Sequence, residues 1–305
     1  MRKISNPFSF GFLSIAFIII VIGKLVIVAQ TPITGEWKSD ARSEKNDSGK
    51  IHLSFERRTD NGRNQHGSSF AYSELQGLTQ EQSRSGRVSF RLVREAGVIE
   101  CEGTFTDGKG SGTFTFTPDA GFVAGMRSRG FDFERSTGKH DDVAGRLLSA
   151  ALINVTTTLA DDLRSVGFGD LDVDDLFKAA IFKVDSKFMA EMKATGFPNL
   201  TMEDLVKARI FKINADFVRK VNDMGFGTKD FEHLVKYSIF KVTPEFLAEL
   251  KSAGFDNLSA EEVVKFRIFK IDGDFIRRAK AEDPNVTVED MVKMKIGVKR
   301  MKNTY

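Results

Sequence analysis

The chain has 305 residues, which is long enough for two domains. Its 45 lysine and arginine residues nearly balance its 42 acidic residues, and the net charge is only +3. A dedicated nucleic-acid-binding protein would carry a concentrated basic excess, so we expect no nucleic-acid partner. A single cysteine rules out an intramolecular disulfide framework, and together with four histidines it leaves little material for a metal or thiol site.

Residues 1–30 have the pattern of an export signal or a membrane anchor. A basic start at residues 1–3 precedes an almost unbroken apolar run at residues 7–29. Small residues near Ala29 suit signal-peptide cleavage. About 20 apolar residues can also cross a bilayer, so a retained membrane tether through residues 7–29 stays open, with Lys24 near one end reaching the interface. Either way, the remaining chain is expected outside the cytoplasm, in the periplasm, secreted or held at the inner membrane.

Residues 31–118 are predicted to form an antiparallel β domain. Apolar and polar side chains alternate, as in half-buried strands, over residues 51–56, 88–92, 99–105 and 114–116. Ala96-Gly97 and the run at 107–110 supply hairpin turns, and the polar stretches 40–50 and 59–69 are interpreted as loops. The pattern predicts a meander of about six strands with one apolar face. That face must curl into a barrel or pack on helices.

The residues that could carry chemistry in this domain are better explained as structural. His52 falls on the polar face of a strand and His66 in a polar loop, and no His, Cys or carboxylate cluster has metal-ligand spacing. Cys101 falls on the apolar face, where a buried, inert thiol is the usual outcome. We therefore expect no enzyme activity, no metal site and no cofactor.

Residues 119–302 are predicted to form an α-helical repeat domain. The motif Ile-Phe-Lys, followed by Val or Ile, recurs every 29 residues, and a Gly-Phe pair keeps the same step. The motif begins at Ile181, Ile210, Ile239 and Ile268, and the pairs at Gly167, Gly196, Gly225 and Gly254. The motif isoleucines are expected to be buried between neighbouring units.

Each unit is predicted to hold two short helices. The first begins at a capping residue such as Asp185 or Asn214 and ends at the Gly-Phe pair, where glycine suits a left-handed turn. The second has about eleven residues and ends at Ile-Phe-Lys. The pattern predicts about six helix pairs, with degenerate outer units acting as caps.

A ladder of lysines occupies one position of the second helix, at Lys178, Lys207, Lys236, Lys265 and Lys293. Such a stripe could bind phosphate or acidic glycans. However, an acidic residue stands four positions before each lysine, in the order that favours ion pairs within a helix. We therefore interpret this ladder as a self-neutralised, solvated face.

Positions that vary between units are the better candidates for binding, because stacking itself requires the repeated residues. Tyrosine and arginine are common interface anchors. The candidate binding residues are Arg209, Arg219, Tyr237, Phe266, Arg267 and Arg277. In the alternative interpretation, Phe266 simply fills the core.

Four segments resemble the extracytoplasmic tail of bacterial BlaR-type membrane metallopeptidases. They are residues 87–97, 103–105, 112–118 and 199–206, and the resemblance extends over residues 34–300. Those tails combine a β domain with Gly-Phe or Gly-Tyr helical repeats. The chain has no His-Glu-x-x-His motif, so no catalytic residue carries over. The resemblance implies an extracytoplasmic sensing or interaction module without the peptidase domain.

Together these patterns predict an α+β protein that binds or scaffolds a protein or peptide partner in the bacterial cell envelope, without enzyme activity. The alternative is a small-molecule carrier or sensor with a lipocalin-like β domain, suggested by Gly35-x-Trp37. A cavity lined by Phe55, Phe90, Leu92 and Phe105 would favour the carrier. A filled sheet would count against it.

Overall fold

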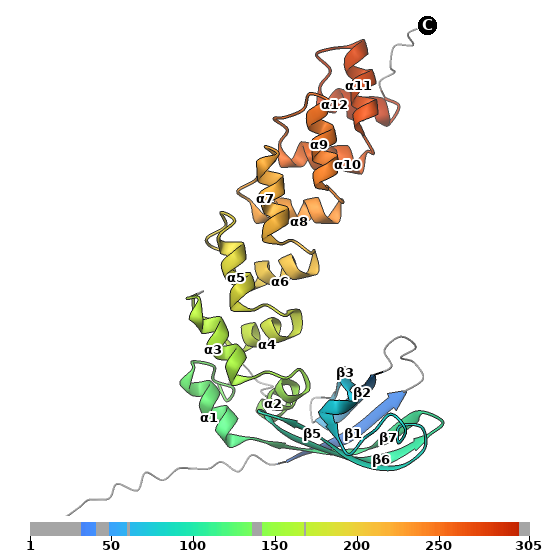
Figure 1. Ribbon diagram of the computed structural model, residues 1–305, viewed down its shortest axis with the longest axis vertical. Coiled ribbons are helices and arrows are strands. Elements are labelled where there is room, and N and C mark those ends of the chain that lie inside the picture. The colour runs from blue at the N-terminus through green and yellow to red at the C-terminus, as the bar shows by residue number, and fades with distance from the viewer. Residues whose placement is uncertain (1–31, 41–48, 60–61, 136–141, 168, 299–305) are drawn as a thin grey trace, which may run out of the picture.

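The computed structural model describes residues 32–40, 49–59, 62–135, 142–167 and 169–298. These residues form an antiparallel sheet followed by helices, which confirms the α+β class. The sheet lies at one end, and the helices extend away from it in a long stack that ends with α12 (Figure 1). The predicted signal or anchor at residues 1–30 lies outside the described residues.

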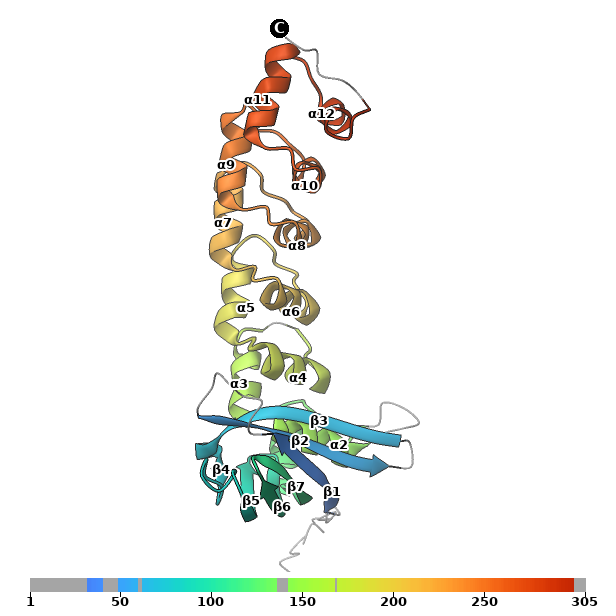
Figure 2. The same cartoon turned by 90° about the vertical axis from the view of Figure 1, so that its right-hand side faces the viewer.

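Seven strands form one curled sheet in the order β3-β2-β1-β7-β6-β5-β4, with every pair antiparallel (Figure 2). Both predicted hairpins are present, but the first turn is Glu95-Ala96, one residue earlier than predicted, and the second is only Asp107-Gly108, because Lys109 and Gly110 already belong to β7. The strands are β1 Ile33–Asp40, β2 Lys50–Thr59, β3 Gly62–Ala71, β4 Leu75–Gln76, β5 Gly86–Arg94, β6 Gly97–Thr106 and β7 Lys109–Pro118.

The predicted loop at residues 59–69 is wrong, because most of it belongs to strand β3. This strand pairs with β2 along its whole length, from Gly62 opposite Thr59 to Ala71 opposite Lys50. It is an edge strand, and its first six residues are exposed. A strand that is solvated on both faces needs no apolar alternation, so the sequence carries no period-2 signal there.

Aromatic side chains fill the concave face of the sheet. Trp37 is completely buried, its ring lies 5.3 Å from that of Phe90, and its indole nitrogen donates to the Glu102 carbonyl over 3.1 Å. Gly103 and Gly112 pair across β6 and β7 beneath it. A Cβ on Gly103 would lie 2.6 Å from the Trp37 ring, and one on Gly112 would clash with the backbone of β6, so the indole requires glycine at position 103 and the strand pairing requires it at position 112.

Helix α2 packs on this face, so the sheet is covered by a helix rather than closed into a barrel. The four residues proposed to line a carrier cavity, Phe55, Phe90, Leu92 and Phe105, are each at most 2% exposed. The hollow between Phe55 and α2 has a volume of only about 110 Å³. The filled sheet counts against the lipocalin-like carrier.

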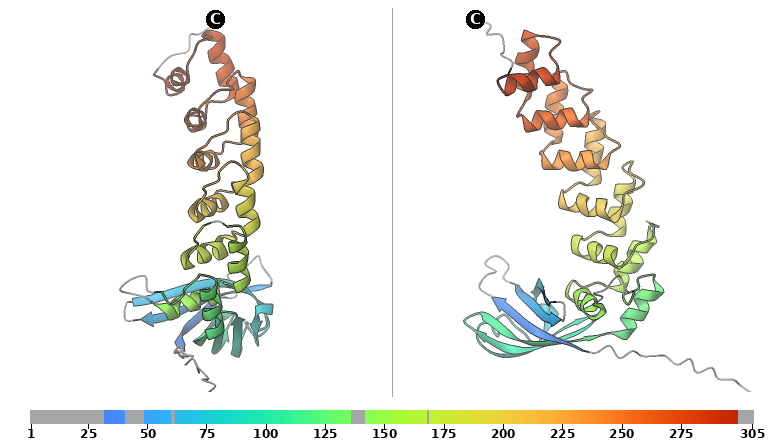
Figure 3. Two further views of the ribbon diagram at one scale, coloured as in Figure 1. Left: turned by 90° about the vertical axis from the view of Figure 1, so that its left-hand side faces the viewer. Right: turned by 180° about the vertical axis from the view of Figure 1, so that it is seen from behind.

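Twelve α-helices follow in the described residues. From α3 onward they form two rows, in which odd-numbered helices run along the long axis and even-numbered helices lie across it (Figures 2 and 3). Their bounds are α1 Ala120–Ser128, α2 Val143–Leu152, α3 Thr157–Ser165, α4 Val173–Phe182, α5 Ser186–Lys193, α6 Met202–Ile210, α7 Ala215–Asp223, α8 Phe231–Ile239, α9 Pro244–Ser252, α10 Ala260–Ile268, α11 Gly273–Glu282 and α12 Val288–Lys295.

The helices begin and end where the capping signals place them. Side chains such as Asn214 and Thr243 accept a hydrogen bond from the backbone of the first turn. Gly196, Gly225 and Gly254 have φ of +99°, +87° and +77°, which confirms the predicted left-handed turns. The even-numbered helices from α4 onward have eight to ten residues, somewhat fewer than the eleven expected.

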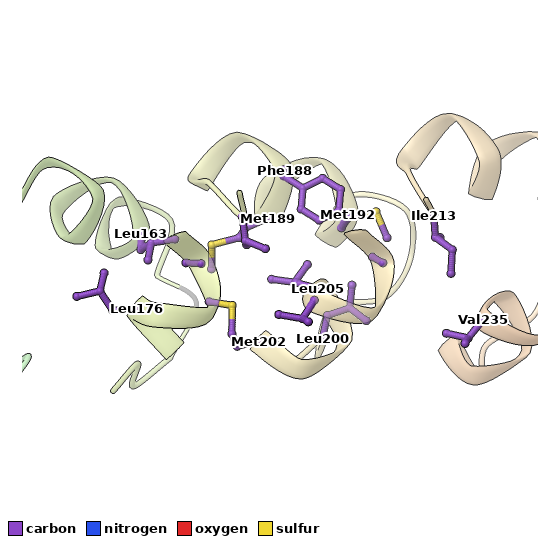
Figure 4. Packing of buried hydrophobic residues seen from close by; sticks show 14 of the residues in the cluster. Leu163, Leu176, Phe188, Met189, Met192, Leu200, Met202, Leu205, Ile213 and Val235 are labelled. Atoms are coloured by element: carbon purple, nitrogen blue, oxygen red, sulfur yellow. The ribbon is translucent and has the colours of Figure 1, made fainter. Parts of the chain in front are cut away.

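The core continues from the sheet into the stack. Phe133 contacts Phe122 of α1 and Phe177 of α4, with ring centroids 5.4 and 6.0 Å apart. Farther along, Met189 and Met192 of α5 face Leu205 of α6 (Figure 4). Among the described helices, no single one is long and apolar enough to span a membrane, and α2 with α3 would pass that test only as a pair bent by 86°.

Candidate binding surface

The motif isoleucines are exposed, so the prediction that they are buried is wrong. The exposed fractions of Ile181, Ile210, Ile239, Ile268 and Ile296 lie between 48% and 55%. The fourth residue of the motif takes the core position instead. Val184, Ile213, Val242 and Ile271 are each at most 2% exposed. Helices α4, α6, α8 and α10 therefore each end with one isoleucine in solvent and one aliphatic side chain in the core.

A lysine in the left-handed conformation exposes the isoleucine and buries the fourth residue of the motif. Lys241 has φ of +55°, its N–H donates to the Ser238 carbonyl, and the Val242 N–H donates to the Tyr237 carbonyl over 2.7 Å. These two bonds make a Schellman turn, which ends the helix and returns the next residue to its apolar face. The same conformation recurs at Asn154, Lys183, Lys212, Lys270 and Gly297.

The sequence predicted a left-handed residue only at the Gly-Phe pairs, so these lysine turns were missed. Schellman turns with glycine at the left-handed position occur at Gly225 and Gly254, and they alternate along the chain with the lysine turns at Lys212, Lys241 and Lys270. The lysine turn carried a weaker signal, because a side chain with a Cβ disfavours positive φ. The asparagine and glycine in the outer units, at positions 154 and 297, were the available clue.

Three of the five lysines in the ladder of the even-numbered helices are neutralised, but by different partners from those expected. Lys178 Nζ lies 2.6 Å from a carboxylate oxygen of Glu203, and Lys207 and Lys265 pair in the same way with Glu232 and Glu289. These glutamates belong to the next even-numbered helix and not to the lysine's own. The hydrogen bond with glutamate raises the pKa of each of these lysines.

Glu261 breaks this pattern of lysine–glutamate pairs. Glu261 accepts a hydrogen bond from His233 Nε2 at 2.6 Å and not from Lys236. Hydrogen bonds from its own backbone N–H and from His233 lower the pKa of Glu261. The three lysine–glutamate pairs and the His233–Glu261 pair thus join successive even-numbered helices electrostatically.

The left-handed lysines form a second ladder of the opposite character. Lys183, Lys212, Lys241 and Lys270 are all exposed. Within the described residues, none of these four has a carboxylate within ion-pair distance. Each stands two residues after an exposed isoleucine, so cation and apolar side chain recur together along one edge of the stack.

An apolar groove lies between two of these lysines. It has a volume of about 350 Å³ and is bounded by the ends of α6 and α8 and the starts of α7 and α9. Phe211, Phe217 and Pro244 contribute apolar lining, and Lys212 and Lys241 both border it. The groove can therefore receive an apolar side chain with a negative charge close by.

The candidate binding residues do not come together in one site. Tyr237 and Phe266 are completely buried and fill the core, so the prediction that they anchor a partner is wrong. The Tyr237 hydroxyl donates to the Phe226 carbonyl, and burial raises its pKa to about 12. The ring of Phe266 packs edge-on against Phe255.

The four arginines lie on two different rows. Arg209 stacks on the Phe188 ring at 3.7 Å, and Arg267 Nε donates to the Phe240 carbonyl over 3.1 Å, so both tie an even-numbered helix to the chain before it. Arg219 and Arg277 are exposed on α7 and α11, where each lies near an aspartate of its own helix. Only Arg209 and Arg267 lie close in sequence to the second lysine ladder.

The β domain offers no comparable surface in the described residues. Cys101 is 1% exposed, as expected, and burial raises the pKa of its thiol, which keeps it protonated and unreactive. No group of three or more histidine, cysteine or acidic side chains could hold a metal ion in the part of the chain that the structure describes.

Comparison with known proteins gives no relative on which to base a function. The chain matches no protein-family model, no curated protein and no solved structure at a significant level.

Proposed function

We propose that this chain is a non-enzymatic binding or sensing protein of the bacterial cell envelope. Helices α3 to α12 would act as an array of 29-residue helix pairs that holds a protein or peptide partner. The observation that carries this proposal is the row of half-exposed isoleucines at one repeated position. Isolated exposed apolar residues need no explanation, but apolar residues that line up on one edge are typical of an interaction surface.

Two further features support the proposal. Stacking already has its own buried residues, such as Leu234 and Val242, so it does not require the exposed isoleucines. The basic start and long apolar run of residues 1–30 support export from the cytoplasm, with cleavage or a retained tether at residues 7–29. The resemblance to the tails of BlaR-type metallopeptidases points to the same location and to a similar role in sensing or interaction.

The array itself can be tested by truncation. In a linear array each unit contacts only its neighbours, so deleting residues 272–305 should remove the helicity of α11 and α12 and leave that of α3 to α8. Far-UV circular dichroism during denaturant unfolding measures this. Loss of all helicity would show that the helices form one closed globule, and the array would be abandoned.

Partner binding can be tested by site-specific photo-crosslinking in the cells that produce the protein. A photoreactive phenylalanine derivative replaces Ile239 on the exposed edge or, as a matched control, Ala248, which is exposed on α9 in the other row. The proposal predicts one discrete adduct from position 239 that excess unlabelled protein competes away. Equal adducts from both positions, or none from position 239, would refute it.

A further inference from the structure

We propose that the partner segment is an extended acidic peptide with apolar side chains, bound along the edge that carries both isoleucines and left-handed lysines. This inference rests on the proposed function and specifies the chemistry of the partner. The edge is defined by Ile181, Lys183, Ile210, Lys212, Ile239, Lys241, Ile268 and Lys270.

The backbone conformation of the four lysines is the first argument. Positive φ is disfavoured for a lysine and readily adopted by glycine or asparagine. The outer units have Asn154 and Gly297 at this position with the same left-handed conformation, so the turn itself does not need lysine. The central units thus carry a strained residue where an unstrained one would serve. Strain of this kind is typical of sites where the side chain has another role.

The charges are the second argument. In the first ladder, Lys178, Lys207 and Lys265 each have a glutamate partner on the next even-numbered helix, while Lys236 and Lys293 have no carboxylate partner among the described residues. In the second ladder, none of the four lysines has a carboxylate partner among the described residues. A row of cations without intramolecular counterparts is complementary to a row of carboxylates on another molecule.

The shape of the edge is the third argument, and it favours a peptide over a membrane surface. The groove beside Lys212 and Lys241 is a recess of about 350 Å³ with Phe211 and Phe217 in its wall. A single apolar side chain can enter such a recess, whereas a bilayer contacts mainly what protrudes. In an extended chain that alternates apolar and acidic residues, the apolar side chains would contact the isoleucines and enter the groove. The carboxylates would pair with the lysines.

Fluorescence anisotropy with defined probes tests this inference on the exported chain. The probe is a labelled random copolymer of glutamate and tyrosine, which needs no knowledge of the register. A copolymer of lysine and tyrosine reverses its charge, and vesicles of phosphatidylglycerol and phosphatidylcholine represent an anionic membrane. We expect the acidic copolymer alone to bind, with an affinity that falls as salt is added.

Two quadruple variants with the same change in net charge distinguish binding at this edge from a nonspecific effect of net charge. In the first, lysines 183, 212, 241 and 270 become asparagine, the residue that the outer unit has at position 154. In the second, lysines 178, 207, 236 and 265 become glutamine. We expect the first to weaken copolymer binding about tenfold or more and the second to change it by less than about twofold.

Several results would overturn the inference. They are the absence of copolymer binding, an equal loss in both variants, or lysine-dependent binding to the vesicles without binding to the copolymer. A third variant with glycine at the four left-handed positions repeats the test should the asparagine variant fail to fold. If the Ile239 crosslink to the same partner persists in the asparagine variant, the acidic peptide is wrong while the proposed function stands.

Discussion

The sheet and the helical stack are stabilised over different distances along the chain. In the sheet, side chains remote in sequence meet in one core, as when Trp37 packs against Phe90 and Phe105. In the stack, contacts between successive helices join residues close to one 29-residue step apart, such as Lys178 with Glu203 and Lys280 with the Ala253 carbonyl. A local change should therefore disturb the whole sheet, but only the neighbouring helices of the stack.

The largest effect is expected from Phe114→Ala in the sheet. Phe114 is 1% exposed and its ring packs edge-on against Phe55 at 5.3 Å. Loss of the ring and the cavity left behind should lower the free energy of unfolding by about 3–5 kcal/mol. Trp37 is the only tryptophan and lies in the sheet, so its fluorescence during denaturant unfolding reports this region.

The same experiment tests whether the two regions are independent. Far-UV circular dichroism at the helical band reports mainly the stack, since the twelve α-helices follow the sheet. We expect Phe114→Ala to shift the fluorescence transition much more than the helical transition. Coincident shifts of equal size would show that sheet and stack unfold as one unit.

The next largest effect separates the core of the stack from its exposed edge. Leu234 is completely buried in α8, and Leu234→Ala should lower the free energy of unfolding by about 2–5 kcal/mol. Ile239, five residues later, is 50% exposed, and Ile239→Ala should change it by only about 0.5 kcal/mol. Urea unfolding followed by circular dichroism compares the two. Similar losses would mean that a neighbouring unit covers Ile239 in solution.

Ile239 also shows what the sequence could and could not predict. Strong periodic signals were sufficient for the helices, the hairpins at Glu95-Ala96 and Asp107-Gly108, and the glycine turns. The burial of each motif residue was not predictable in the same way. The repeated Ile-Phe-Lys-Val contains two aliphatic residues, and only the left-handed lysine decides which of them enters the core.

The ion pairs and the edge strand were missed for related reasons. An acidic residue four positions before a lysine is a local pattern, whereas the shortest ion pair of Lys178 is with Glu203 on the next even-numbered helix, which depends on how the helices stack. Strand β3 is held by its register with β2, and most of its side chains are exposed. Interactions that depend on a neighbouring element leave little trace in local spacing.

A smaller effect is expected from Gly225→Val, which tests the glycine turn of the stack. Gly225 has φ of +87°, and an added Cβ would find only the Asp256 carbonyl nearby, at 3.7 Å. Its penalty is therefore conformational and should lower the free energy of unfolding by about 1–2 kcal/mol. Lys236→Ala, at an exposed position of α8, should change it by less than about 0.5 kcal/mol. Equal changes in melting temperature would contradict the left-handed turn at Gly225.

The smallest effect has the opposite sign and tests the lysine turn. Lys241 has φ of +55°, which disfavours a residue with a Cβ by about 1–2 kcal/mol. Glycine removes this strain but loses about 0.5–1 kcal/mol of conformational entropy on folding. Lys241→Gly should therefore raise the free energy of unfolding, by about 0.5–1 kcal/mol on these figures.

Lys236→Gly is the matched control for this substitution. It makes the same chemical change five residues earlier, inside α8, where glycine should lower the free energy of unfolding by about 1 kcal/mol. Thermal unfolding by circular dichroism should show the two variants moving in opposite directions from the unsubstituted protein. If Lys241→Gly were destabilising as well, the lysine side chain would contribute to folding within the chain itself, and there would be no reason to assign it to a partner.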